Sequence, residues 1–182
     1  MHYQVGVVAP EISVFWRFLI AAIAMFIIAV LRCEPLHYAL EDHGRFAAMG
    51  MLMFSSNFIL FYHGAQSIPS GLLSVVFSLA SIINLLLAAI VFKQPITGRI
   101  ALGAVLGTAG IGLLFAPQIL GADMQTASAK GLLLCVAGTL CFCAGNLFSG
   151  ESQRRGIGVI SASAWGMAYG TVWSGILSWF MG

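Results

Sequence analysis

The sequence predicts an all-α fold, a polytopic bundle of transmembrane helices. Hydrophobic residues make up 60% of the 182-residue chain and charged residues only 8%, whereas soluble domains carry about 25% charged residues. Six apolar stretches are each long enough to cross a hydrocarbon core of about 30 Å as a helix. Residues 85–92 contain no polar residue, so the polar–apolar alternation of a membrane β-barrel strand is absent there. Backbone amides in lipid must pair internally, which leaves helices.

The predicted spans fill most of the chain, and the segments between them hold nearly all of its charges. From the N-terminus they are Ile12–Leu31, Phe46–Tyr62, Ser70–Phe92, Ile100–Ala116, Gly131–Ser149 and Val159–Met181. Pro69 and Pro95 lie next to the starts of the third and fourth spans, where the fixed φ and missing N–H of proline are tolerated. The first span lacks the preceding basic region and the cleavage site of a signal peptide, so we expect it to be retained.

Basic residues are distributed unequally between the two sides of the predicted bundle. If the spans alternate in direction, one side holds Arg32, Arg45, Lys93, Arg99, Arg154 and Arg155. The other side holds Lys130, with Arg17 just inside the membrane. Short cytoplasmic loops carry the excess of Lys and Arg. The predicted cytoplasmic loops are therefore 32–45, 93–99 and 150–158, in an integral protein of the bacterial inner (plasma) membrane.

This topology places both termini outside. An outside N-terminus is unusual for an uncleaved inner-membrane protein that has only eleven residues before its first span. We therefore expect one more helix ahead of Met1.

Small residues recur at four-residue spacing on two of the spans. Gly103 and Gly107 form one such ridge, and Gly166, Gly170 and Ser174 form another. Ridges of this kind let helix backbones approach closely in lipid. We expect them to pack inside the bundle, with the interface of a homodimer as the alternative.

Polar residues inside the spans are the candidates for a solute pathway. Substrate sites of transporters lie near the midplane and are lined by polar groups. Ser78, Ser81 and Asn84 lie on one face of the third span, because residues three apart on a helix are neighbours. The other candidates are Asn57, Arg17 and Asn146. Each has a structural alternative: hydrogen bonding to a neighbouring helix for the amides and hydroxyls, and anchoring at the interface for Arg17.

No pattern of catalytic or metal-binding residues is present. The predicted spans contain no Asp or Glu, and no two histidines have the i, i+4 spacing of a helical metal site. Cys135, Cys141 and Cys143 share one span and are expected to act as small apolar residues. The sequence therefore predicts neither an enzyme nor a cofactor or metal. It contains no basic run for nucleic acid, and the expected partners are the lipid bilayer and a small-molecule solute.

Several segments resemble one transporter family. Ala9-Pro10 followed by Phe15–Ala22 resembles the second helix of EamA-type permeases of the drug/metabolite transporter superfamily. The stretch Asn57–Leu114 is similar to their third to fifth helices: an aromatic-rich helix, a small polar turn, a long apolar helix, a short charged loop and a glycine-rich helix. Residues 131–146 are similar to the start of the family's second repeat. The chain differs in having Gln94 where a Glu is common, and Ser81 near a usual proline.

The resemblance implies a fold and an activity. Family members have ten helices in two inverted five-helix repeats, and this chain corresponds to helices two to seven. Residues 1–116 would form a first repeat without its first helix, and residues 117–182 the first two helices of the second repeat. The third span is the counterpart of a family helix that lines the central cavity. The implied function is a permease, or a fragment of one, that moves small organic solutes by alternating access. The alternative is a non-transporting membrane subunit or a truncated remnant.

Overall fold

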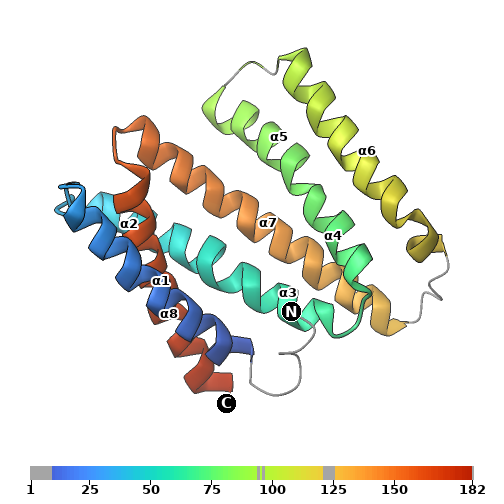
Figure 1. Cartoon of the computed structure of the whole chain (residues 1–182), viewed down its shortest axis with the longest axis horizontal. Coiled ribbons are helices and arrows are strands. Elements are labelled where there is room, and N and C mark those ends of the chain that lie inside the picture. Colours follow the sequence, from blue (N-terminus) through green and yellow to red (C-terminus); the bar gives the residue numbers. More distant parts are fainter. Residues whose placement is uncertain (1–9, 94, 96, 121–125, 182) are drawn as a thin grey trace.

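The computed structural model describes residues 10–93, 95, 97–120 and 126–181, and within these residues it contains helices and short connections but no strand. The predicted all-α class is therefore confirmed. The elements are α1 (Pro10–Leu31), α2 (Leu40–Met51), the π-helix η1 (Leu52–Ser56), α3 (Asn57–Ala65), α4 (Ser70–Ser78), α5 (Ala80–Phe92), α6 (Gly98–Leu120), α7 (Thr126–Arg154) and α8 (Val159–Met181) (Figure 1).

These elements make six helical rods in the described part of the chain. The segment α2–η1–α3 is one rod, and α4–α5 is another that is interrupted only at Leu79. Several rods extend beyond the predicted apolar stretches: α7 reaches Arg154, and α2 begins at Leu40 rather than Phe46. The difference arises because polar residues at a helix end continue the backbone hydrogen bonding outside the apolar region.

Four described segments are long and apolar enough to cross a membrane. They are Ile12–Leu31, Leu40–Ala65, Ser70–Phe92 and Ala129–Arg154. The crossing of the membrane by α6 and α8 stays a prediction, and so does the inverted repeat. Many large apolar side chains are exposed on these rods, as on Ile20 (66%) and Ile90 (73%), which is the expected surface of a protein whose solvent is lipid.

Helix α7 lies at the centre of the fold (Figure 1). It packs against α2–η1–α3 on one side and against α4–α5 on the other, while α6 packs on α4–α5 at one edge. At the opposite edge α1 and α8 pack together, and α8 also covers α2. Consecutive rods α2–η1–α3 and α4–α5 therefore meet near their connecting loop, and α7 separates them further along.

Glycines bring two pairs of rods into backbone contact. Gly131, Gly138 and Gly145 recur every seven residues on α7, and a Cβ on any of them would lie within 3.0 Å of a neighbouring side chain. The neighbours are Ile68 and Ser67, Phe61, and Met53, respectively. Because a side chain would not fit there, these glycines fix the distance between α7 and the α2–η1–α3 rod.

The two predicted small-residue ridges have different outcomes. Gly166 and Gly170 on α8 pack tightly against α2 and η1, where a Cβ on Gly170 would lie 2.9 Å from Gly50 O. Packing inside the bundle is thus confirmed for this ridge. For Gly103 and Gly107 it is wrong, since a Cβ at either position meets nothing within 4 Å. The reason is that α6 turns a different face toward α4–α5.

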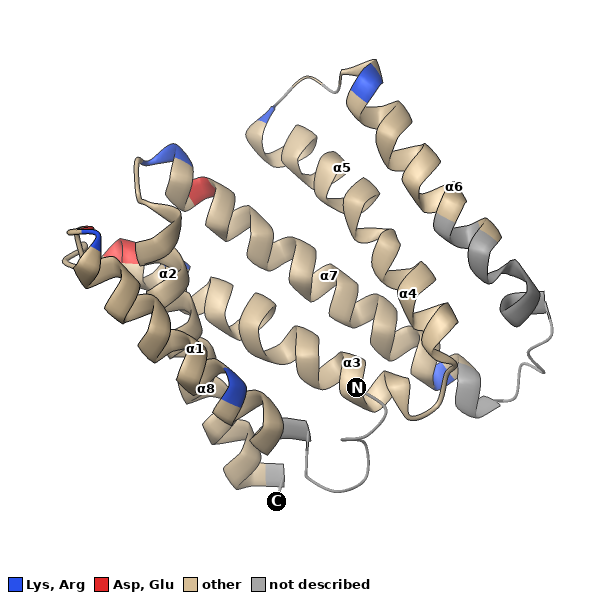
Figure 2. Cartoon of the chain, in the orientation of Figure 1, with Lys and Arg blue, Asp and Glu red and all other residues tan. Residues whose placement is uncertain are grey.

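Charged side chains gather at the two ends of the rods (Figure 2). The connections α1–α2, α5–α6 and α7–α8 share one end of the bundle, and most of the Lys and Arg residues lie there. Arg17, the only basic residue of α1, lies in the N-terminal half of its helix, away from the α1–α2 connection. The arrangement has the one-sided charge that the predicted topology requires.

Candidate functional site

Two interruptions of regular helix occur in neighbouring parts of the bundle. In η1 the N–H of Asn57 donates to Leu52 O, five residues back, instead of to Met53 O. In the next rod Leu79 N–H donates to Val76 O, three residues back, at 3.2 Å. π-Helical turns are rare in proteins, and those that occur are often at functional sites. Transporters commonly form their substrate sites at interrupted helices. A functional site is therefore expected around both interruptions.

The first cavity is polar and lies between α5 and α7. It has a volume of about 380 Å³ and is open to the surface, with Asn84, Ala88, Phe92, Asn146, Leu147, Ser149, Gly150, Gln153 and Arg154 on its walls. Asn146 Nδ2 donates to Asn84 Oδ1 at 3.5 Å, a long hydrogen bond between the two helices. Arg154 lies over the ring of Phe92 at 4.9 Å, which places a cation at the charged end of this cavity.

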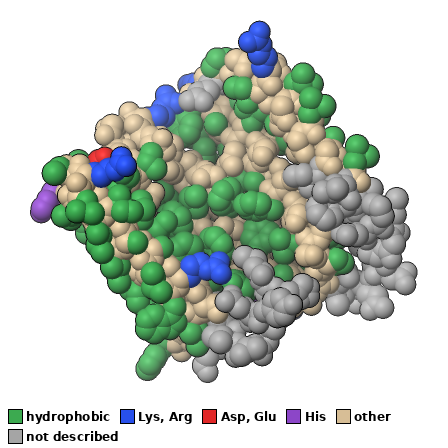
Figure 3. Space-filling model, viewed as in Figure 1, with side chains coloured by type: hydrophobic (Ala, Val, Ile, Leu, Met, Phe, Trp, Pro, Cys, Tyr) green, Lys and Arg blue, Asp and Glu red, His purple; other side chains and the backbone are tan. Residues whose placement is uncertain are grey.

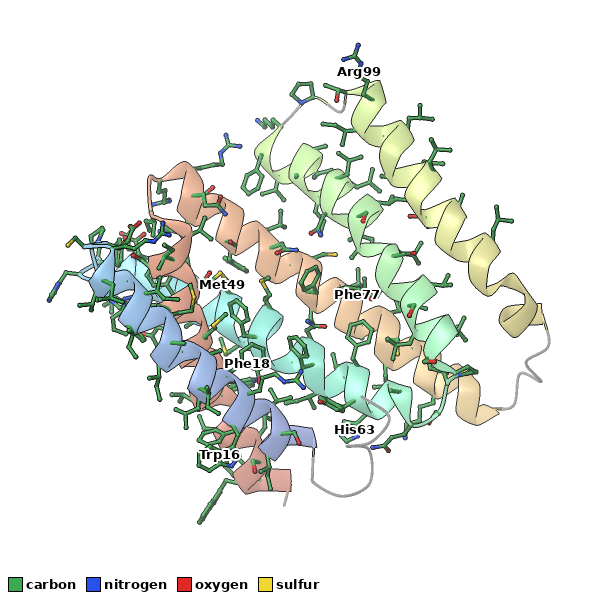
Figure 4. The ribbon with its side chains drawn as sticks, in the orientation of Figure 1. Trp16, Phe18, Met49, His63, Phe77 and Arg99 are labelled. Atoms are coloured by element: carbon green, nitrogen blue, oxygen red, sulfur yellow. The ribbon has the colours of Figure 1, made fainter. Side chains whose placement is uncertain are left out.

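The second cavity is lined mainly by aromatic rings. It has a volume of about 300 Å³ and is bounded by α3, α4 and α7, with Asn57, Phe58, Phe61, Leu73, Ser74, Phe77 and Phe142 on its walls. Phe77 lies between α4 and α7 (Figure 4). Its ring centroid is 5.4 Å from that of Phe61 and 5.1 Å from that of Phe142, so one ring from each helix contributes to a continuous aromatic wall.

Asn57 is the polar residue of the aromatic cavity with an unsatisfied atom. Its side chain is 97% buried, and its Nδ2 donates to Met53 O at 3.3 Å, in place of the backbone N–H that η1 redirects to Leu52 O. This bond fixes the orientation of the amide, because only its nitrogen can donate. No donor among the described residues reaches Oδ1. A buried acceptor without a partner costs about 1–3 kcal/mol.

Arg17 projects from α1 toward α3. Its Nη2 donates to Tyr62 Oη at 3.1 Å, and its Cζ lies 5.8 Å from the ring centroid of Phe58. Phe58 also lines the aromatic cavity. The described residues supply no carboxylate partner for Arg17, so its guanidinium keeps unused donors near this cavity. The face of the molecule seen in Figure 3 is hollowed across its middle, with hydrophobic side chains on the floor of the hollow.

The structure separates the predicted polar face of the third span. Asn84 and Asn146 are brought together in the polar cavity, whereas Ser78 and Ser81 line neither cavity. Ser78 Oγ donates to Val75 O in its own helix at 2.6 Å, and Ser81 is exposed. The interruption at Leu79 lies between Ser78 and the other two, so the regular spacing of one helix does not apply across it.

Sequence reasoning did not select the four phenylalanines of the second cavity. The signal is present but unspecific: they are four of 13 phenylalanines in the chain, and aromatic residues fill membrane helices for many reasons. The described residues contain no cluster of three His, Cys, Asp or Glu side chains that could hold a metal ion. Cys135 and Cys143 are fully buried against neighbouring helices, consistent with packing.

These features define a helical integral membrane protein with polar and aromatic cavities between its helices. A family model matches residues 1–116, and its description is the EamA-like transporter family. The match covers more than half of the chain, so the chain belongs to this family. Its members are membrane transporters of small solutes. The family is a transporter family and not an enzyme family. No curated protein and no solved structure matches the chain significantly.

Proposed function

We propose that this protein is a carrier-type permease of the bacterial inner membrane that moves small organic solutes by alternating access. The observation that carries the proposal is the polar cavity between α5 and α7, where Asn84 and Asn146 meet. The two amides share only one long hydrogen bond at the wall of an open cavity, so they keep most of their donors and acceptors for a solute. They lie beside interrupted helices, in a chain of a transporter family.

The two cavities are arranged in sequence along α7. Phe142 lines the aromatic cavity and Asn146 the polar cavity, one helical turn apart. Asn57, Arg17, Asn84 and Asn146 would then all border one pathway, with α7 as its central wall. Ser78 would take part only if α4 changes its orientation relative to α5 at Leu79, and Ser81, which lies on α5 with Asn84, only if α5 itself rotates. A bend of this kind at Leu79 would let one rod open one end of the pathway while it closes the other, as alternating access requires.

The test is solute flux in proteoliposomes, measured with a panel of labelled small solutes that includes neutral amino acids, sugars and aromatic acids. At least one member should be moved above the rate of empty liposomes. Asn84→Ala should lower that flux severalfold, while the free energy of unfolding changes by only about 0.6 kcal/mol, the average for a polar contact between membrane helices.

Leu86→Ala is the matched control, because Leu86 lies on the same helix and its side chain is 47% exposed. It should keep the flux of the parent protein. The pathway assignment is wrong if Asn84→Ala transports normally, or loses flux only in proportion to lost protein. If no member of the panel is moved, the permease proposal itself fails.

A further inference from the structure

We infer that the aromatic cavity is a binding site for an aromatic solute that carries a hydrogen-bond donor and no positive charge. This inference rests on the proposed function and names the class of solute for the cavity formed by α3, α4 and α7. Three properties of the cavity lead to it: its shape and lining, its unsatisfied acceptor, and the charge beside it.

The lining favours a flat apolar body. Four of the seven lining residues are phenylalanines, and the volume of about 300 Å³ is at the lower end of the range for small-molecule sites. Phe77 is also 40% exposed at the surface of the rod. Aromatic pairs are favourable in edge-to-face and offset arrangements, so the rings of α3, α4 and α7 would surround a planar solute on several sides.

The unsatisfied acceptor favours a donor on that solute. Asn57 Oδ1 is buried and lacks a partner among the described residues, while Nδ2 is held by Met53 O. Oδ1 has almost no accessible surface in this conformation, but Asn57 already forms part of the cavity wall. A small turn of its side chain would expose Oδ1 to a solute hydroxyl or N–H, which would satisfy it. The preference follows from the cost of leaving this acceptor unpaired, which a solute without a donor cannot remove.

The charge beside the cavity disfavours cations. Aromatic rings attract cations through their faces, but the guanidinium of Arg17 already lies 5.8 Å from the Phe58 ring. None of the seven lining residues is charged. The only Asp or Glu on α3, α4 or α7 is Glu151, which lies near the C-terminal end of α7, beside the polar cavity. A cationic solute would therefore meet a like charge without a counter-charge, whereas an anionic one would find a donor in Arg17.

The experiment measures equilibrium binding of four naphthalene probes to the protein in lipid nanodiscs, with empty nanodiscs subtracted. The probes share one ring system: 2-naphthol, 2-methoxynaphthalene, 2-naphthoate and 2-naphthylmethylammonium. 2-Naphthol should bind about tenfold more tightly than 2-methoxynaphthalene, which lacks the donor. 2-Naphthoate should bind more tightly than the ammonium probe, and Arg17→Gln should remove that difference.

Variants test whether the probes occupy this cavity. Phe77→Leu and Phe142→Leu should each weaken 2-naphthol binding about fivefold. Phe180→Leu is the matched control, since that ring is 80% exposed at the end of α8, and it should leave binding unchanged. Phe77 is the more tolerant position because of its exposure, so it carries the test if Phe142→Leu does not fold.

The inference is overturned if 2-naphthol binds no better than to empty nanodiscs, if all four probes bind equally, or if Phe77→Leu binds like the parent. Its failure is separable from that of the permease proposal. Flux of other solutes without naphthyl binding rejects the aromatic site alone. Selective naphthyl binding without flux of any solute rejects transport and keeps the site.

Discussion

The close approach of α2 and α8 makes Gly50, among the glycines that the structure describes, the most sensitive position for a single added methyl group. In Gly50→Ala, the new Cβ would lie 2.7 Å from Gly170 N and closer still to Gly166 O. Both are backbone atoms and cannot rotate away. Carbon atoms are in best contact at about 3.5–4.0 Å, so the two helices must separate by about 1 Å to restore contact distances.

The cost of that separation can be estimated. A gap of this size forfeits a quarter to a half of the dispersion energy at the contact, and overpacking typically costs about 1–3 kcal/mol. We expect the upper end, about 3 kcal/mol and roughly 10 °C in the unfolding midpoint, because neither helix can yield locally. Gly103→Ala is the control: its Cβ meets nothing within 4 Å, and it should be neutral or stabilise by up to ~1 kcal/mol.

The assay can use the protein's own thiols. Cys135 and Cys143 are fully buried, so a fluorogenic thiol reagent reports their exposure as the protein unfolds on heating. Cys33 is exposed and Cys141 only half-buried, so both are replaced by Ser in every variant. If Gly50→Ala unfolds at the same temperature as the parent, or if Gly103→Ala is the less stable of the two, the packing argument is refuted.

Three further predictions follow from the same features. A single cysteine at position 95, in a cysteine-free background, should resist an impermeant reagent applied to intact cells, because the loop 93–99 is predicted to face the cytoplasm. Labelling from outside would show that the predicted topology is inverted. Gly107→Leu should leave the unfolding midpoint of the purified protein unchanged, because the position faces open space; a clear loss would mean that another surface covers it. Trp165→Phe removes the indole donor to Leu36 O (3.2 Å) and should speed hydrogen exchange in residues 33–39, whereas unchanged exchange would show that this bond does not hold the loop.

Hydropathy alone predicts the rods, because in lipid the length of an apolar stretch decides whether it forms a helix. It does not predict where a rod deviates. The π-helical turn begins at Leu52, and the run Ser55-Ser56-Asn57 marks it only as a polar patch. Leu79 interrupts the next rod without a proline or glycine at that position. Both deviations depend on packing against other helices, and single-span patterns do not contain that information.

The site shows the same limit. Asn84 and Asn146 are each identifiable as costly polar residues in a span, but their meeting depends on α7 packing against α5, across 62 residues of sequence. The glycine ridges at 103–107 and 166–170 have the same spacing, yet only the second finds a partner helix. Spacing identifies a face that can be packed closely, and only the assembled bundle determines which helix packs there.

The central position of α7 has a consequence for biosynthesis. A ribosome delivers α2–η1–α3 and α4–α5 to the membrane before α7, yet both rods pack chiefly on α7 rather than on each other. The segment that matches the family model, residues 1–116, therefore enters the bilayer with its two central rods lacking their common neighbour. The two rods must therefore either remain unpacked against each other or separate again before α7 can pack between them. We expect the early chain to be a target for membrane chaperones and proteases, and its lifetime to depend on how soon residues 126–154 emerge.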